Sequence, residues 1–98
     1  MKTLKVSSQS KAYAVATSIS EIIKEEGEVQ VVSIGAASLN EATKAIIYAK
    51  GNLSTVGMSM YCIPSFVDVD IDDGTEIGGK PKIRTAIKWV IKGVKETV

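Results

Sequence analysis

The organisation of this chain follows most directly from Ile34-Gly35-Ala36-Ala37-Ser38-Leu39-Asn40-Glu41-Ala42-Thr43-Lys44-Ala45. The β-branched residues that precede it, 29–34, predict a buried strand, and Gly35 with the two alanines predicts a tight turn. Ser38 and Glu41 have the spacing of a capping box, in which each side chain accepts from the other residue's backbone N–H. A strand that leads through a short turn into a helix predicts an α/β fold.

The segments before this stretch predict a strand, a helix and the buried strand already described. Residues 2–7 alternate apolar and polar side chains, which is typical of a short strand. From Ala12 onward, apolar residues recur at helical spacing for about three turns. Ser8 or Ser10 is the expected cap of this helix, and Gly27 is its expected end.

The segments after the second helix predict a third strand, in two parts on either side of Pro64, and a fourth strand. The second helix is expected to end near Gly51, and residues 56–63 predict a third strand. Pro64 cannot donate to a strand ladder, so it marks a sheet edge, a bend or a bulge. Residues 66–72 and 83–91 both alternate, the first with aspartates and the second with a largely basic set, which predicts a hairpin.

The complete order is β-α-β-α-β-β in a single domain over residues 1–98. Because parallel strands need right-handed crossovers, two crossovers followed by a hairpin predict a four-stranded mixed sheet with two helices on one face. This is a two-layer α/β sandwich. No element of the chain covers the second face of the sheet, so a partner subunit, a nucleic acid or solvent must cover it.

The composition excludes several classes of function. The chain has no histidine, and Cys62 is its one cysteine, so neither a disulfide nor a Cys/His metal site is available and the thiol lacks an activating base. No cofactor motif or nucleophile–base pair is found, and we expect a non-enzymatic protein without cofactor or metal. No apolar run has the length of a membrane span or signal peptide, so we expect a cytoplasmic protein that does not bind membranes.

The charges are unevenly distributed, although the formal net charge is only +1. Residues 66–76 carry five acids and no base, whereas residues 80–95 carry six bases and no acid. The basic strand is able to follow a phosphate backbone. Alternatively, the acids and bases neutralise each other as Asp–Lys pairs across the hairpin. A calcium loop beginning at Asp68 is excluded, because the sixth and twelfth positions are Asp73 and Gly79 rather than glycine and glutamate.

Two further features are candidates for ligand binding. The turn at Gly35, with Asn40 and Lys44 one helical turn apart, suits a phosphate or another anion, because free backbone N–H groups and a cation come together there. The alternative is a packing turn with a solvated Lys44. Tyr61 and Trp89 are candidates for stacking on a base, but aromatic residues of alternating strands more often pack in a core or an interface.

Four blocks of sequence resemble the stage V sporulation protein S family, which has an Alba-like fold. The blocks are Leu4-Lys5-Val6-Ser7, Ile34-Gly35-Ala36 with Leu39 to Ala45, Cys62-Ile63-Pro64-Ser65-Phe66, and Arg84-Thr85-Ala86-Ile87-Lys88. The resemblance implies a homodimeric regulatory protein of sporulation that binds DNA or RNA, since Alba-like relatives bind nucleic acid through their sheet hairpin and helix-start loops. The implied contacts are Lys5, Ser7, Asn40, Lys44, Arg84 and Lys88, to which we add the charge of Lys11.

Two departures from the family and two rival functions accompany this resemblance. The family commonly has glutamine where this chain has Glu41, and the hairpin loop 73–82 is longer than expected. The first rival is a protein-interaction module of the sporulation or cell-division machinery, because adjacent acidic and basic strips favour specific protein partners. The second is a sensor that holds an anionic metabolite at the turn after residue 34.

Overall fold

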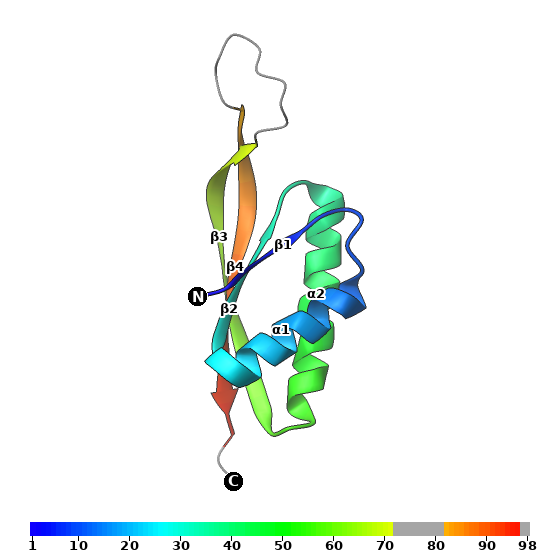
Figure 1. The fold of residues 1–98 in the computed structure, drawn as a ribbon, viewed down its shortest axis with the longest axis vertical. Coiled ribbons are helices and arrows are strands. Elements are labelled where there is room, and N and C mark those ends of the chain that lie inside the picture. The colour runs from blue at the N-terminus through cyan, green and yellow to red at the C-terminus, as the bar shows by residue number, and fades with distance from the viewer. Residues whose placement is uncertain (72–81, 97–98) are drawn as a thin grey trace.

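The computed structural model describes residues 1–71 and 82–96. Its elements are β1 (Thr3–Val6), α1 (Ala12–Glu26), β2 (Glu28–Ser33), α2 (Ala36–Ser54), β3 (Met58–Ile71) and β4 (Lys82–Lys95). The strands form one mixed sheet in the order β1-β2-β4-β3, and both helices lie on the same side of it (Figure 1). The predicted order and the predicted two-layer sandwich are confirmed, and they agree with an Alba-like fold.

The strand pairing produces a short sheet with a long hairpin. β1 pairs with β2 in parallel, β2 pairs with β4 antiparallel, and β4 pairs with β3 antiparallel. The pairing of β2 with β4 stops at Ser33 and Ile87, whereas the pairing of β3 with β4 continues to Ile71 and Lys82. The hairpin therefore projects beyond the helices as a two-stranded ribbon (Figure 1).

The core lies between the helices and the central strands. Ile19 and Ile23 of α1 are completely buried, as are Val29 and Val31 of β2 and Ile91 of β4. The face of α2 that packs inward consists of Ala42, Ala45, Ala49 and Leu53, all fully buried. Small side chains on α2 let α1 cross it closely. Each large side chain contributes about 1.5–3 kcal/mol by leaving water.

Both predicted helix caps are wrong. α1 begins at Ala12 with Lys11 in the cap position and no side-chain hydrogen bond, while the Ser10 hydroxyl accepts from the Ser7 N–H at 2.9 Å. α2 begins at Ala36, two residues before the predicted cap Ser38. Gly35 adopts a φ of 88°, and this angle directs the chain from the end of β2 into the helix within one residue. The Ser38 hydroxyl consequently lies inside the helix and donates to the Gly35 carbonyl at 3.0 Å.

The ends of the elements agree with the sequence only in part. Gly27 ends α1 in the left-handed region with a φ of 84°, as predicted. α2 does not end near Gly51 but continues to Ser54, because Leu53 extends its buried face by one turn. The chain then turns at Gly57, so β3 begins at Met58 and not at residue 56.

Pro64 lies on the edge of the sheet. It is opposite Trp89, and the register of β3 with β4 continues without interruption on both sides of it. Of the three alternatives for this proline, the sheet edge is therefore the one that is realised, since the outer side of β3 needs no donor. The longer hairpin loop, apart from Lys82, lies outside the described residues.

Candidate nucleic-acid interface

The hairpin separates acidic and basic side chains onto its two faces. Asp68 lies opposite Thr85 and accepts a hydrogen bond from its hydroxyl at 3.3 Å, whereas Arg84 lies opposite Val69. Because side chains alternate along a strand, the aspartates at 68 and 70 point to the helix side and Arg84 and Lys88 point away from it. Asp68 and Asp70 therefore form no ion pair with Arg84 or Lys88, whereas Asp72 and Lys80, which also belong to the Asp–Lys alternative, lie outside the described residues.

The sheet surface that points away from the helices, here called the open face, collects cations from three parts of the sequence. One row across the sheet consists of Lys5, Val32, Lys88 and Ser65, and the second row from it on the same face contains Glu28, Lys92 and Tyr61. Arg84 follows two rows beyond Lys88 on the projecting ribbon. Among the described residues, none of these cations forms an ion pair. The surface is therefore positively charged with a single described carboxylate in these two rows.

A groove of about 640 Å³ joins the open face to the start of α2. Its polar lining includes Lys5, Ser7 and Arg84, together with the turn of residues 34–38 and Asp70. The first backbone N–H groups of α2 have no hydrogen-bond acceptor within the helix, so they add partial positive charge to the groove. Two side-chain cations and a helix N-terminus thus face one groove that also contains a carboxylate.

The structure brings four of the seven predicted site residues together. Lys5, Ser7 and Arg84 line the groove, and Lys88 lies on the open face beside it. The Ser7 hydroxyl already accepts from the Gln9 N–H at 3.1 Å. Lys11 lines a smaller groove of about 260 Å³ that it shares with Lys5, on the other side of β1.

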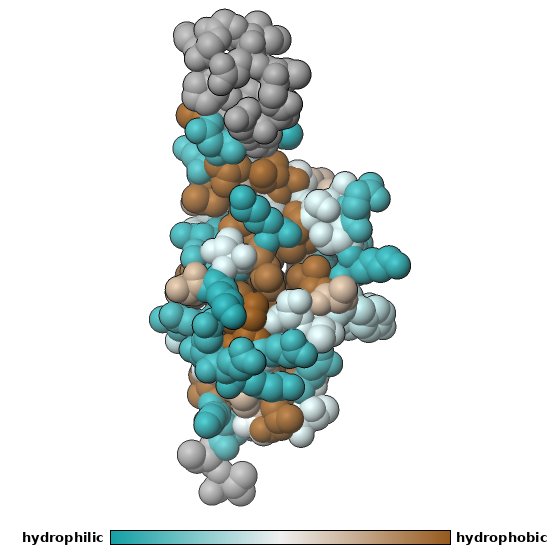
Figure 2. All heavy atoms as spheres, in the orientation of Figure 1, coloured by the Kyte–Doolittle hydropathy of each residue, from teal (hydrophilic) through white to brown (hydrophobic). Residues whose placement is uncertain are grey.

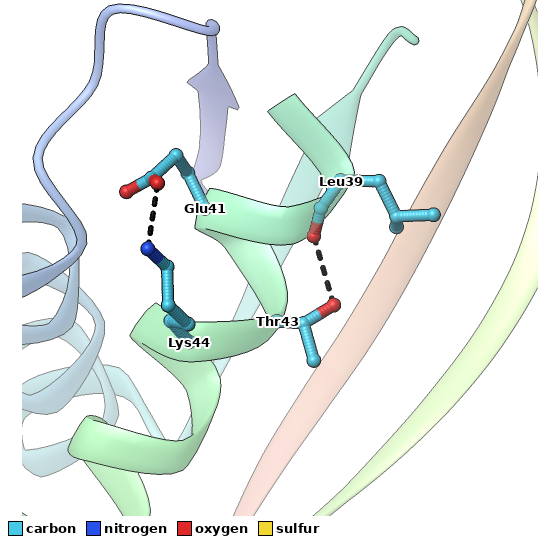
Figure 3. A network of polar contacts seen from close by, with 4 residues as sticks. All are labelled: Leu39, Glu41, Thr43 and Lys44. Atoms are coloured by element: carbon cyan, nitrogen blue, oxygen red, sulfur yellow. Dashed lines mark hydrogen bonds and ion pairs between the residues drawn. The ribbon is translucent and has the colours of Figure 1, made fainter. Parts of the chain in front are cut away.

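Asn40 and Lys44 lie outside the groove. Lys44 donates to the Glu41 carboxylate at 2.8 Å, on the side of α2 opposite Leu39 (Figure 3). This hydrogen bond and the charge of Glu41 raise the pKa of Lys44. Asn40 is exposed and does not line the groove. The structure therefore does not assemble the predicted anion site from Asn40 and Lys44, although the backbone turn that the sequence singled out is part of the groove.

The two aromatic candidates point to opposite sides of the sheet. Trp89 packs against the core, and its Nε1 is buried without a hydrogen-bond partner among the described residues. Tyr61 is 50% exposed on the open face, in register with Lys92. The sequence singles out Tyr61 only as a stacking candidate and Lys92 only as part of the basic strand. Neither is among the seven predicted contacts, although the alternation that identified Lys88 also places Lys92 on its face. Cys62 packs against the core, and burial raises the pKa of its thiol.

A comparison with known families identifies the family of the chain. Within the described part of the chain, neither helix is long and apolar enough to cross a membrane. The family model of stage V sporulation protein S matches residues 2–94, which is nearly the whole chain and includes all four of the blocks that suggested the resemblance. The chain belongs to the stage V sporulation protein S (SpoVS) family and is a sporulation-associated protein.

Proposed function

We propose that this protein is a dimeric, non-enzymatic regulator of sporulation that binds nucleic acid. The observation that carries the proposal is the separation of charge on the hairpin, which leaves Lys5, Lys88, Lys92 and Arg84 on one continuous surface. A polyanion gains from such a surface because each cation that meets a phosphate releases counterions. The net charge of +1 is no obstacle, since Asp68 points to the helix side and Asp70 is the one described carboxylate that lines the groove with Lys5 and Arg84.

The helix side of the hairpin supports the dimer. Phe66 is 80% exposed and Ile83 is 65% exposed on this side, which Leu39 of α2 also faces (Figure 3). Hydrophobic atoms reach the surface along the upper hairpin in Figure 2. An isolated two-stranded ribbon is marginally stable in water. A second copy of the chain would cover these side chains and stiffen the ribbon, with the cationic side left free for nucleic acid.

The direct test is fluorescence anisotropy of labelled duplex DNA, single-stranded DNA and RNA over a salt series. We expect saturable binding to at least one probe, with an affinity that falls steeply as salt increases. The double variant Arg84→Ala/Lys88→Ala should reduce the slope of log affinity against log salt by up to about two, one for each lost phosphate contact.

The matched control removes two exposed lysines from the helical layer, Lys24→Ala/Lys50→Ala. It makes the same change in net charge but leaves the open face intact, so the salt slope should stay near that of the unmodified protein. Absence of binding to every probe at low salt contradicts the proposal. An equal reduction of slope by both double variants contradicts the assignment of the open face.

A second candidate function is a protein-interaction module of the sporulation or cell-division machinery. The acidic side of the hairpin favours it, because Asp68 and Asp70 beside exposed apolar side chains form a mixed strip of the kind found in protein interfaces. A stable protein partner that is retained after nuclease treatment, together with no binding to the nucleic-acid probes, supports this alternative.

A further inference from the structure

The open face presents an aromatic ring as well as cations. Tyr61 is 50% exposed, and Ile63, its neighbour on the same face of β3, is 52% exposed. The side chains before and after Tyr61 point the other way, since Met60 and Cys62 pack against the core. The burial of Met60 and Cys62 therefore holds the Tyr61 side chain on the open face, although β3 is an edge strand.

Cations lie on the same face as this ring, one of them directly beside it. Lys92 lies directly opposite Tyr61 on β4, and Lys88 follows two rows farther along the same face. The row between them begins with Ile63 and Val90 next to the ring and ends with Gln30 and Thr3 on the two farther strands. The Gln30 side-chain amide donates to the Thr3 hydroxyl at 3.4 Å. The carboxylate in this region, Glu28, lies on the far side of Lys92 from Tyr61.

This combination favours one physical form of nucleic acid. Cations alone bind a duplex and a single strand alike, because both carry a phosphate backbone. An exposed tyrosine on a flat sheet has no access to the bases of a duplex, which are stacked inside the helix. In a single strand the bases are able to stack on an aromatic side chain while the phosphates meet neighbouring lysines.

We propose that the open face binds single-stranded nucleic acid, with one base stacked on Tyr61 and the backbone following Lys92 and Lys88 toward Lys5 and Arg84. This inference rests on the proposed function, because it specifies the form of nucleic acid that the same surface binds. It assigns to Tyr61 the task of selecting single strands over duplexes, and to the cations the task of supplying affinity.

The test compares Tyr61→Leu, Tyr61→Phe and the matched control Tyr13→Leu, which replaces a tyrosine that is 71% exposed on α1. The probes are labelled oligothymidine, oligouridine and a mixed-sequence duplex, measured by anisotropy at one salt concentration and in a salt series. Tyr61→Leu should weaken binding to the single strands about 5- to 100-fold, the range of a lost base–aromatic stack. Tyr61→Phe and Tyr13→Leu should leave it nearly unchanged, and the salt slope of Tyr61→Leu should be retained because no cation is lost.

A second measurement does not depend on the stability of the variants. Photocrosslinking of an iodouracil-substituted single strand to the unmodified protein, followed by peptide mapping, should identify Tyr61 as an attachment site. Two outcomes overturn this inference and leave the proposed function standing. In one, the protein binds the duplex as tightly as the single strands or more tightly. In the other, Tyr61→Leu and the unmodified protein bind the single strands equally. Absence of binding to all three probes overturns both.

Discussion

At the scale of single residues, Gly93 is the position with the least room. Its N–H donates to the Gly27 carbonyl at 2.9 Å, which fixes β4 to the end of α1. A Cβ at this position would overlap Ile23 Cγ2 and lie 3.1 Å from Met58 Cε. Glycine is therefore required here by packing, since its backbone conformation is available to other residues.

Gly93→Ala should lower the free energy of unfolding by about 1–3 kcal/mol, because the added methyl group overpacks a core without free space. Denaturant unfolding measures the loss. In the background Ile23→Ala the same substitution should cost less, since the overlapping methyl group is gone, and the double-mutant cycle reports this coupling. Equal costs in both backgrounds would contradict the packing explanation.

Single residues also explain why the sequence predicted some contacts wrongly. Ser38 and Glu41 satisfy the spacing of a capping box, but spacing alone does not tell where the helix begins. The positive φ of Gly35 starts α2 two residues earlier, so Ser38 lies inside the helix and Glu41 is free to pair with Lys44. The dihedral angle of a glycine cannot be read from its neighbours in sequence.

At the scale of elements, Gly35 determines where α2 begins and therefore where its free N–H groups face the groove. Its φ of 88° and ψ of 163° belong to a region that is open essentially to glycine. A Cβ at Gly35 would meet nothing within 4 Å, so any cost of substitution comes from the backbone conformation.

Gly35→Ala should therefore lower the free energy of unfolding by about 1–3 kcal/mol. The matched control is Gly51→Ala, whose Cβ also meets nothing within 4 Å but whose position in α2 is helical. That control should be stabilising by about 0.4–1 kcal/mol. Thermal or denaturant unfolding of both variants distinguishes backbone strain at Gly35 from a general effect of removing glycine. If Gly35→Ala stabilises the protein, the explanation by backbone strain is wrong.

The order of elements was predictable because alternation and helical spacing report burial directly. The alternation of apolar and polar side chains also predicted the strand of residues 83–91 and its basic outer face. What alternation does not give is the register between strands, so the sequence left open whether the aspartates and the cations share a face. That question depends on which residues pair across a hairpin whose long loop contains two turn signals, Asp73-Gly74 and Gly78-Gly79, so that neither one fixes the register.

At the scale of the whole molecule, the two sides of the projecting hairpin have different physical character. The open side is cationic, whereas the helix side exposes Phe66 and Ile83, with Asp70 directly opposite Ile83 and Asp68 between Phe66 and that pair. Contiguous exposed apolar patches rimmed by polar residues often mark a site of interaction with a partner. The proposed dimer uses the apolar side and leaves the cationic side for the ligand.

Phe66→Asp should convert the dimer into a monomer, because it places a charge within the proposed interface. Light scattering coupled to size exclusion measures the mass in solution. The control Val56→Asp changes a residue that is 52% exposed in the turn before β3, and it should leave the mass unchanged. A monomeric unmodified protein, or a dimer that persists in Phe66→Asp, contradicts this interface.

The unbroken register of β3 with β4 restricts how the gene of such a protein is able to change in length. A single codon inserted within either paired segment would exchange the two sides of the ribbon beyond it, because side chains alternate with a period of two. An insertion in β4 would turn its basic side chains toward the proposed dimer contact, and an insertion in β3 would turn Phe66 away from it. Codons added between residues 71 and 82 leave this register unaltered. Natural variation in hairpin length is therefore expected between residues 71 and 82.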